Sequence, residues 1–273
     1  MKDTKQLKIT IIGAGNLGVA LARGLAKSKK YDAAKITLTR RRASHLEALK
    51  KEGFNVSTEN AKAVVGADII VVAVLPQQFN SALTEIKPVI KAGKQLIISL
   101  VTGVSSKDIL HLLGGKNRVV RAMPNTAIAI GESMTCLSTL NAPEQDVALA
   151  KSMFDTVGET VIIGEEYMTA ATALVACGIA FFLRAVRAAS QGGTEIGFHA
   201  EEALKMAAQT AKGAASLILS RSHHPEMEID KVTSPKGCTI AGLNEMEHQG
   251  FSSAMIKGII TSANKAGVLY SKD

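Results

Sequence analysis

The sequence predicts an α/β fold in which an N-terminal doubly wound, Rossmann-type sheet precedes an all-helical C-terminal domain. Up to about residue 164, short β-branched runs alternate with amphipathic stretches, which is typical of βαβ units. A glycine-rich turn follows the first of these runs, and alanine-rich segments with helical periodicity fill the chain from residue 165 onward. We therefore expect two domains, residues 1–164 and residues 165–273.

The elements follow from local composition and periodicity. Buried strands are predicted at residues 9–12, 35–39, 54–56, 69–74, 95–99, 119–122, 134–138 and 160–163. Helices are predicted at residues 19–25, 43–52, 78–89, 106–112 and 144–156, and then at 168–190, 200–220, 240–249 and 252–268. Pro225 and Pro235 interrupt the second series, and each favours a helix start over a helix interior.

A glycine-rich turn joins the first predicted strand to the first predicted helix. Gly13 permits a tight turn, Gly15 leaves room for a pyrophosphate to approach the backbone, and Gly18 lets the helix pack closely on the strand. The amides near Asn16 and Leu17 lie at the positive end of the helix, which suits a phosphate group. The turn predicts a dinucleotide site, although similar turns are also purely architectural.

Three arginines, Arg40, Arg41 and Arg42, follow the second predicted strand. An NAD site usually has Asp or Glu here to bind the ribose hydroxyls, and Asp32 precedes the strand and is a poor substitute. Guanidinium groups can instead pair bidentately with a 2′-phosphate. The arginines therefore favour NADP(H) over NAD(H), with a solvated basic turn as the alternative.

Two loops at predicted strand ends are candidates for the nicotinamide side of the site. Val74 and Pro76 lie where the chain leaves the strongest strand and can form a wall, or only a connector. Asn125 follows the strand at 119–122, and its amide can hold the carboxamide or a polar group of the substrate. The alternative for Asn125 is an Asx turn that stabilises the strand exit.

The segment from Ser234 to Thr239 combines hydroxyls and a glycine immediately before a predicted helix. Free amides and hydroxyls at a helix N-terminus suit a small carboxylate, with an ordinary N-cap as the alternative. His224 before Pro225 is expected to form hydrogen bonds at a helix terminus. We find no Ser-His-Asp, paired-carboxylate or lysine-nucleophile pattern, which fits hydride chemistry carried out by a cofactor.

Composition limits the partners that we expect. The net charge of +8 is scattered, and the lack of Trp with few other aromatics argues against nucleic acid. No apolar run approaches the length of a bilayer-spanning helix, and the N-terminus has no signal-peptide core, so we expect a cytoplasmic protein without a membrane partner. Cys136, Cys177 and Cys238 are expected to be reduced and mostly buried, and no metal site is implied.

The chain resembles the pyrroline-5-carboxylate reductase family nearly from end to end. The resemblance is carried by residues 13–18, 73–77, 121–126, 224–225, 233–240 and 243–251. It implies NADPH- or NADH-dependent reduction of the cyclic imine 1-pyrroline-5-carboxylate to L-proline, the last step of proline synthesis. It also implies a homodimer or a ring of dimers, with interlocked helical domains that serve dimerisation and with substrate sites between the subunits.

The resemblance also assigns roles to individual residues. Those at the substrate carboxylate would be Ser234, Gly237, Cys238 and Thr239. Thr239 would be the catalytic hydroxyl that faces the ring nitrogen, while Pro76 and Asn125 would neighbour the nicotinamide.

The chain departs from the family pattern in four segments. The family usually has Val-Lys-Pro at residues 74–76, Pro-Asn-Thr-Pro at 124–127, Ser-Gly-Ser-Gly-Pro-Ala-Tyr at 175–181 and Ser-Pro-Gly-Gly-Thr-Thr at 234–239. Lys236 can compensate for the lost lysine. The alternatives are a related reductase of another cyclic imine or of a keto acid, and a non-catalytic NADP(H)-binding protein.

Overall fold

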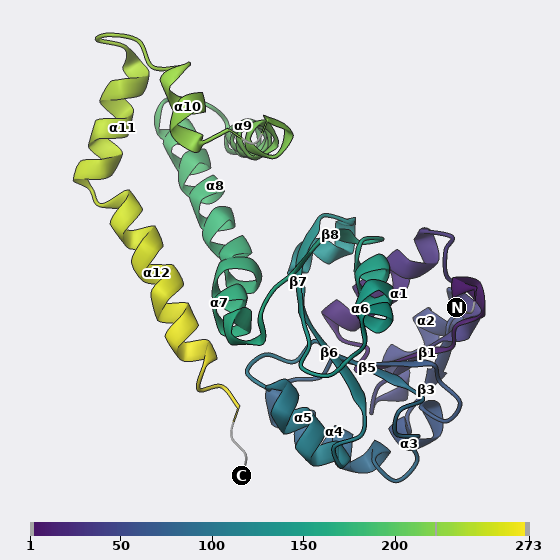
Figure 1. Cartoon of the computed structure of the whole chain (residues 1–273). Helices are drawn as coiled ribbons and strands as arrows, with labels where there is room; N and C mark the ends of the chain where they lie inside the picture. Colours follow the sequence, from purple (N-terminus) through teal and green to yellow (C-terminus); the bar gives the residue numbers. More distant parts are fainter. Residues whose placement is uncertain (1–2, 222, 271–273) are drawn as a thin grey trace. The chain divides into compact units, whose positions relative to one another are not determined.

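An eight-stranded sheet organises the first of two compact units in this computed structural model, which describes residues 3–221 and 223–270 (Figure 1). The sheet order is β3-β2-β1-β4-β5-β6-β7-β8. The strands are β1 Ile9–Ile12, β2 Ile36–Thr39, β3 Asn55–Ser57, β4 Ile69–Val72, β5 Leu96–Ser99, β6 Arg118–Met123, β7 Ser133–Ser138 and β8 Gly158–Ile162. The first unit also includes residues 262–270 of the C-terminal segment.

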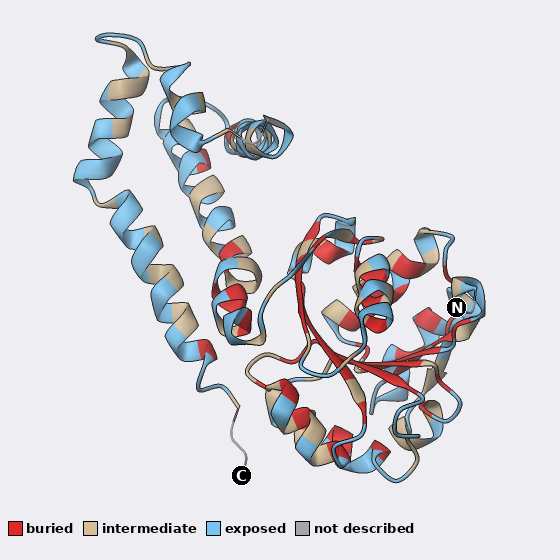
Figure 2. Cartoon of the chain, in the orientation of Figure 1, coloured by how far each residue is buried: buried red, intermediate tan, exposed pale blue. Residues whose placement is uncertain are grey.

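Helices cover both faces of this sheet, because its central strands are apolar on both sides. Ile11 of β1 and Val71 of β4 belong to a core that also contains side chains of α1, α2 and α6. Ile12 and Val72, one residue further along each strand, belong to a second core with α4 and α5. Figure 2 shows this buried layer along the strands. The alternation confirms the predicted doubly wound architecture.

The helices of the first unit match the predicted positions closely. They are α1 Asn16–Lys27, α2 Glu47–Lys51, α3 Asn60–Ala63, α4 Pro76–Ile86, α5 Ser106–Leu113 and α6 Glu144–Phe154. Short 3₁₀ turns occur at Thr4–Gln6, Ala33–Lys35, Ala43–His45, Thr126–Ile130 and Glu165–Tyr167. The helix predicted at residues 43–52 is split into a 3₁₀ turn and α2, and the short α3 was not predicted.

One strand pair corrects the expectation of parallel βαβ units. β7 runs antiparallel to β6, with Arg121 opposite Ser138, whereas all other neighbouring strands are parallel. The link from β6 to β7 contains only the 3₁₀ turn Thr126–Ile130. A parallel return needs a crossover of about a dozen residues or more. The chain therefore folds back beside β6, and the sheet is mixed.

The described residues of the second unit, Gly178–Thr261, are helical apart from connecting turns, and they lie within the region predicted to be helical from residue 165 onward. It contains α8 Gly178–Glu195, α9 Ala200–Arg221, α10 Pro225–Asp230, α11 Cys238–His248 and most of α12 Phe251–Ala266. α7 Met168–Ala171 and a π-helical segment, Thr172–Cys177, precede α8. Pro225 starts α10, as expected. Pro235 instead lies in a turn that precedes α11, closed by a 2.9 Å hydrogen bond from the Gly237 amide to the Ser234 carbonyl.

Many apolar side chains of the helices are exposed, and Figure 2 shows little burial along α11 and α12. Phe182, Leu183 and Ile256 are 65%, 62% and 56% exposed. The helical run Glu165–Glu195 is long and apolar enough to cross a membrane by length and composition, so the expectation that no run approaches this length was wrong. Only 22% of the most apolar 18-residue stretch of this run is buried within the chain. An exposed apolar surface of this kind marks a site of contact with another surface.

Candidate active site

The glycine turn after β1 is built from close backbone contacts. Gly13 has φ +105°, and a Cβ atom there would collide with the Ala73 carbonyl after β4. A Cβ at Gly18 would collide with the Gly13 carbonyl and lie 3.1 Å from Ile11 Cγ2. These two glycines therefore allow the tight turn and the close approach of α1 that the sequence predicted.

Gly15 differs from these two glycines because nothing lies within 4 Å of the position that its Cβ would take. Gly15 is the N-cap of α1 and no side chain caps this helix, so the first amides, including those of Asn16 and Leu17, have no intrahelical partner. They lie at the carboxyl ends of β1 and β4, where the strand order reverses. The open space and free amides fit a dinucleotide pyrophosphate.

The basic turn lies directly beside the glycine turn. The Gly13 and Ala14 amides donate to the Thr39 carbonyl of β2 at 3.2 and 2.8 Å. The Arg40 guanidinium donates from Nη1 to the Ala14 carbonyl at 3.1 Å. Arg41 and Arg42 are exposed, and neither forms an ion pair within the described chain. Their charges are available to an anion, as the sequence interpretation requires.

The two loops predicted on the nicotinamide side follow β4 and β6. Pro76 is the first residue of α4. Val74, in the loop before it, packs against Gly13, with Cγ1 3.2 Å from the position that a Cβ of Gly13 would take. The Oδ1 atom of Asn125 accepts a hydrogen bond from the Ala127 amide at 3.1 Å, so the Asx turn that remained an alternative is present. Within the described residues its Nδ2 group makes no hydrogen bond, so it remains able to donate to a ligand.

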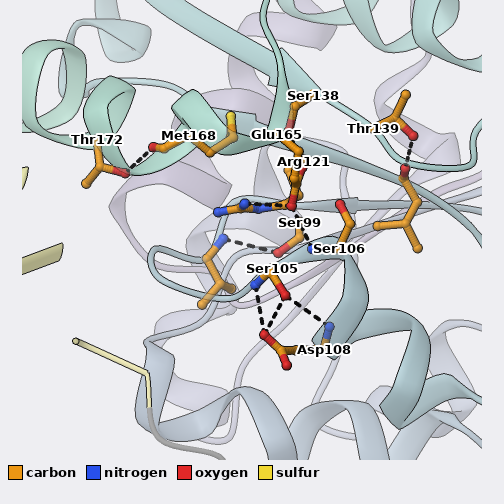
Figure 3. A network of polar contacts seen from close by, with 12 residues as sticks. Ser99, Ser105, Ser106, Asp108, Arg121, Ser138, Thr139, Glu165, Met168 and Thr172 are labelled. Atoms are coloured by element: carbon orange, nitrogen blue, oxygen red, sulfur yellow. Dashed lines mark hydrogen bonds and ion pairs between the residues drawn. The ribbon is translucent and has the colours of Figure 1, made fainter. Parts of the chain in front are cut away.

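A buried polar network that was not predicted from the sequence joins β6, β7 and the N-terminus of α5 to Glu165 (Figure 3). Glu165 accepts hydrogen bonds from Arg121 Nη1 at 2.9 Å, the Ser106 amide at 2.8 Å and Ser138 Oγ at 2.6 Å. Burial by itself raises the pKa of Glu165, but these donors and the Arg121 charge outweigh it and hold the pKa below its ordinary value. The available signal was Arg121, an arginine flanked by apolar residues in the predicted strand at residues 119–122, because a buried charge requires a partner.

The predicted substrate segment forms a compact turn ahead of α11. Gly237 is the N-cap, and a Cβ there would collide with Ser234 Oγ. No side-chain hydrogen bond caps α11, so the hydroxyls do not serve as the ordinary N-cap that was the alternative. The amides of Cys238 and Thr239, in the first turn, have no intrahelical partner. Lys236 has φ +60°, a conformation that favours glycine.

The remaining sequence predictions concern histidine and metal. His224 caps α10, with Nδ1 accepting from the Glu226 amide at 3.3 Å, which confirms the expected role at a helix terminus. Among the described residues we find no group of three or more His, Cys, Asp or Glu side chains that can hold a metal. All three cysteines are free thiols, but only Cys136 is buried, whereas Cys177 is half-buried and Cys238 is exposed, so the expectation of mostly buried thiols was wrong.

The fold and the glycine turn agree with comparisons to known families. Residues 8–103 match the family described as NADP oxidoreductase, coenzyme F420-dependent. Residues 165–269 match the family described as pyrroline-5-carboxylate reductase dimerisation. The Rossmann-type sheet, the open helix N-terminus at Gly15 and the basic end of β2 thus define an NADP-dependent oxidoreductase with an oligomer-forming helical region.

The chain belongs to the pyrroline-5-carboxylate reductase family, because it is 45% identical to pyrroline-5-carboxylate reductase 2 of Dictyostelium discoideum over 97% of this chain and 93% of that protein. Pyrroline-5-carboxylate reductase 1 of the same organism is 52% identical over 97% of this chain, which spans 50% of that protein's length. Plasmodium falciparum pyrroline carboxylate reductase with NADP bound has a TM-score of 0.90 at 25% identity, covering 98% and 100% of the two chains. The Coxiella burnetii pyrroline-5-carboxylate reductase also has a TM-score of 0.90, at 29% identity over 97% and 99%.

Proposed function

We propose that the protein reduces 1-pyrroline-5-carboxylate to L-proline with NADP(H), with NAD(H) as a secondary cofactor. The observation that carries this proposal is 45% identity to a pyrroline-5-carboxylate reductase over nearly the full length of both proteins. The matched region spans both compact units, so it includes the positions of the glycine turn and of the segment before α11. The similarity is therefore not limited to the cofactor fold.

The cofactor would be held by residues at the carboxyl edge of the sheet. The amides of Gly15, Asn16 and Leu17 suit the pyrophosphate, with Gly13 and Gly18 shaping the turn. Arg40, Arg41 and Arg42 suit the 2′-phosphate. The residues proposed for the nicotinamide end are Val74, Pro76 and Asn125. When bound, NADPH supplies a hydride for the imine carbon.

The substrate carboxylate would bind at the N-terminus of α11. The Cys238 and Thr239 amides lie at the positive end of this helix, beside Ser234 and Gly237. In the proposed role, the Thr239 hydroxyl forms a hydrogen bond with the ring nitrogen and orients the imine. These groups bind and orient the substrate. The ring nitrogen is either already protonated in the bound imine or receives a proton relayed by water, so hydride addition to the imine carbon gives the product amine.

We propose that residues 1–164 serve as the dinucleotide-binding domain and residues 165–273 as the helical dimerisation and substrate domain. A homodimer, or a ring of dimers, would cover exposed side chains such as Phe182, Leu183 and Ile256. This accounts for the apolar run Glu165–Glu195 without a membrane. We place the protein in the cytoplasm, where its three free thiols would stay reduced.

The test is oxidation of NADPH by the purified protein with 1-pyrroline-5-carboxylate, with proline measured as the product. Turnover of another cyclic imine or of a keto acid, but not of this substrate, would identify the related reductase that the altered substrate segments permit. Tight NADP(H) binding without turnover of any compound in such a panel would favour a non-catalytic binding protein.

A further inference from the structure

We propose that Glu165 is a positioning residue that holds the loops on the nicotinamide side of the cofactor site in their binding arrangement. The inference rests on the proposed function because it assumes that Asn125 lies near the nicotinamide. It also assumes this of the loop at residues 100–105, which leaves β5 at the same edge of the sheet as the loop that carries Val74 and Pro76 after the parallel strand β4. Glu165 itself stands in the 3₁₀ turn Glu165–Tyr167, after β8 and before α7, away from the glycine turn in sequence. Its effect would reach the cofactor through the elements it contacts.

Three separate elements converge on the Glu165 carboxylate (Figure 3). Oε1 accepts from Arg121 Nη1 of β6 at 2.9 Å and from the Ser106 amide of α5 at 2.8 Å. Oε2 accepts from Ser138 Oγ of β7 at 2.6 Å. Arg121 and Ser138 are opposite each other in the antiparallel pair, so their side chains share one face of the sheet. One carboxylate thus fixes a strand pair and a helix N-terminus together.

The contacts of Glu165 lie on elements that adjoin two loops at strand ends, residues 100–105 after β5 and the strand exit at Asn125 after β6. Ser106 is the first residue of α5, so fixing its amide fixes the end of the loop at residues 100–105. Arg121 precedes the Pro124-Asn125 strand exit on the same strand. The Glu165 carboxylate therefore links the N-terminus of α5, where the loop after β5 ends, to β6, which leads into the strand exit at Asn125. A shift of the start of α5 or of Arg121 would stretch a hydrogen bond to Glu165.

Burial makes this arrangement rigid. The side chains of Arg121 and Glu165 are 7% and 15% exposed, so little water can reach them and substitute for a lost hydrogen bond. An amide in place of the carboxylate would leave the Arg121 charge buried without its counterion. It would also present an NH₂ group toward one of the three donors. A neutral side chain of the same size therefore cannot reproduce the contacts.

The same strand offers a matched control at its other end. Arg118, the first residue of β6, forms a 2.8 Å ion pair with Asp146 of α6, and the Asp146 side chain is 8% exposed. This pair joins β6 to a helix but contacts neither of the two loops. Breaking it should destabilise the protein without disturbing the nicotinamide side. Asp146→Asn therefore separates loss of stability from loss of positioning.

The experiment compares Glu165→Gln with Asp146→Asn by isothermal titration calorimetry. Each variant is titrated with NADP+ and with adenosine 2′,5′-bisphosphate, which keeps the 2′-phosphate but has no nicotinamide. We expect Glu165→Gln to weaken NADP+ binding by roughly tenfold while fragment binding stays within roughly twofold. Asp146→Asn should leave both affinities within roughly twofold. Equal weakening of both ligands by Glu165→Gln, or no weakening of either, would overturn the inference.

A milder variant decides the question if Glu165→Gln does not fold. Ser138→Ala removes one donor to Glu165 and leaves the ion pair intact, and should weaken NADP+ binding by roughly threefold with fragment binding unchanged. Parallel losses for both ligands would again overturn the inference. If the wild-type protein binds NADP+ but does not reduce 1-pyrroline-5-carboxylate, the proposed reaction fails and the positioning role, measured by binding, stands. Absence of NADP+ binding by the wild-type protein would overturn both.

Discussion

The Arg40 guanidinium donates to the carbonyl oxygen of Ala14 at 3.1 Å and so joins the end of β2 to the glycine turn after β1. One N–H of Arg40 is thereby engaged by the backbone, whereas Arg41 and Arg42 are exposed and form no ion pair within the described residues. The three arginines are therefore unequal. Arg40 also holds the turn and has its remaining N–H groups for a ligand, while the whole guanidinium groups of Arg41 and Arg42 can respond to the charge of a ligand.

Arg41→Asp should impair the use of NADPH far more than that of NADH. The substitution removes a cation from the 2′-phosphate site and introduces an anion, and a hydrogen bond to a charged group is worth about 1.5–3 kcal/mol. We expect kcat/KM for NADPH to fall by roughly 10- to 100-fold. Lys51→Asp, at an exposed position of α2, makes the same charge change as a control. Equal losses for the two cofactors would contradict a 2′-phosphate role for the basic turn.

Gly13→Ala and Gly15→Ala should fail in different ways. A Cβ at Gly13 would collide with the Ala73 carbonyl at a φ of +105°, so we expect a loss of roughly 2–4 kcal/mol in the free energy of unfolding. A Cβ at Gly15 meets nothing within 4 Å, so the variant should fold normally but obstruct the pyrophosphate. Thermal unfolding and NADP+ titration of both variants measure this contrast. Normal cofactor affinity in Gly15→Ala would argue against the proposed cradle.

The sequence predicted the strands and helices well because their signals are local. β4, for example, is a run of four buried β-branched residues. The direction of β7 was not predicted, because the hydrophobic pattern of a strand does not show whether the strand runs parallel or antiparallel to its neighbour. That direction depends on the link after β6, which contains only a 3₁₀ turn. The contact between Arg121 and Glu165 joins positions 44 residues apart, so the sequence offered only an arginine that needed a partner. The free amides at Gly15 and Gly237 were easier to predict, because glycine before a helix is a local pattern.

Lys236→Gly should stabilise the fold while weakening substrate binding. Lys236 has φ +60°, where glycine removes about 0.5–1 kcal/mol of strain, and Lys29 at φ +59° provides a matched control. Both glycine variants should have a higher melting temperature. Only Lys236→Gly removes a cation beside the proposed carboxylate site, so it alone should raise KM for 1-pyrroline-5-carboxylate, and Lys236→Arg should restore it. An unchanged KM in Lys236→Gly would show that the lysine does not contribute to substrate binding.

Acid should destabilise the wild-type protein through Glu165. Its pKa in the folded state lies below the ordinary value of 4.5, so ionised Glu165 stabilises the fold above that value, and this stabilisation is lost as pH falls through the folded-state pKa. Glu165→Gln lacks this proton-linked contribution. The difference in free energy of unfolding between wild type and variant should therefore shrink as pH is lowered below about 4.5 in urea titrations. A difference that stays constant over this range would mean that Glu165 does not titrate with a lowered pKa.

Leu183→Asp should disrupt the proposed oligomer. Leu183 lies on α8 and is 62% exposed in the single chain, within a region that matches a dimerisation family. Burying a carboxylate in an apolar interface is costly, so assembly should weaken even where the isolated chain tolerates the change. Light scattering during size-exclusion chromatography should show a lower mass than that of the wild-type protein. Val65→Asp supplies the control, because Val65 is 64% exposed but precedes the matched region and should leave the mass unchanged. An unaltered mass for Leu183→Asp would place the interface on another helical face.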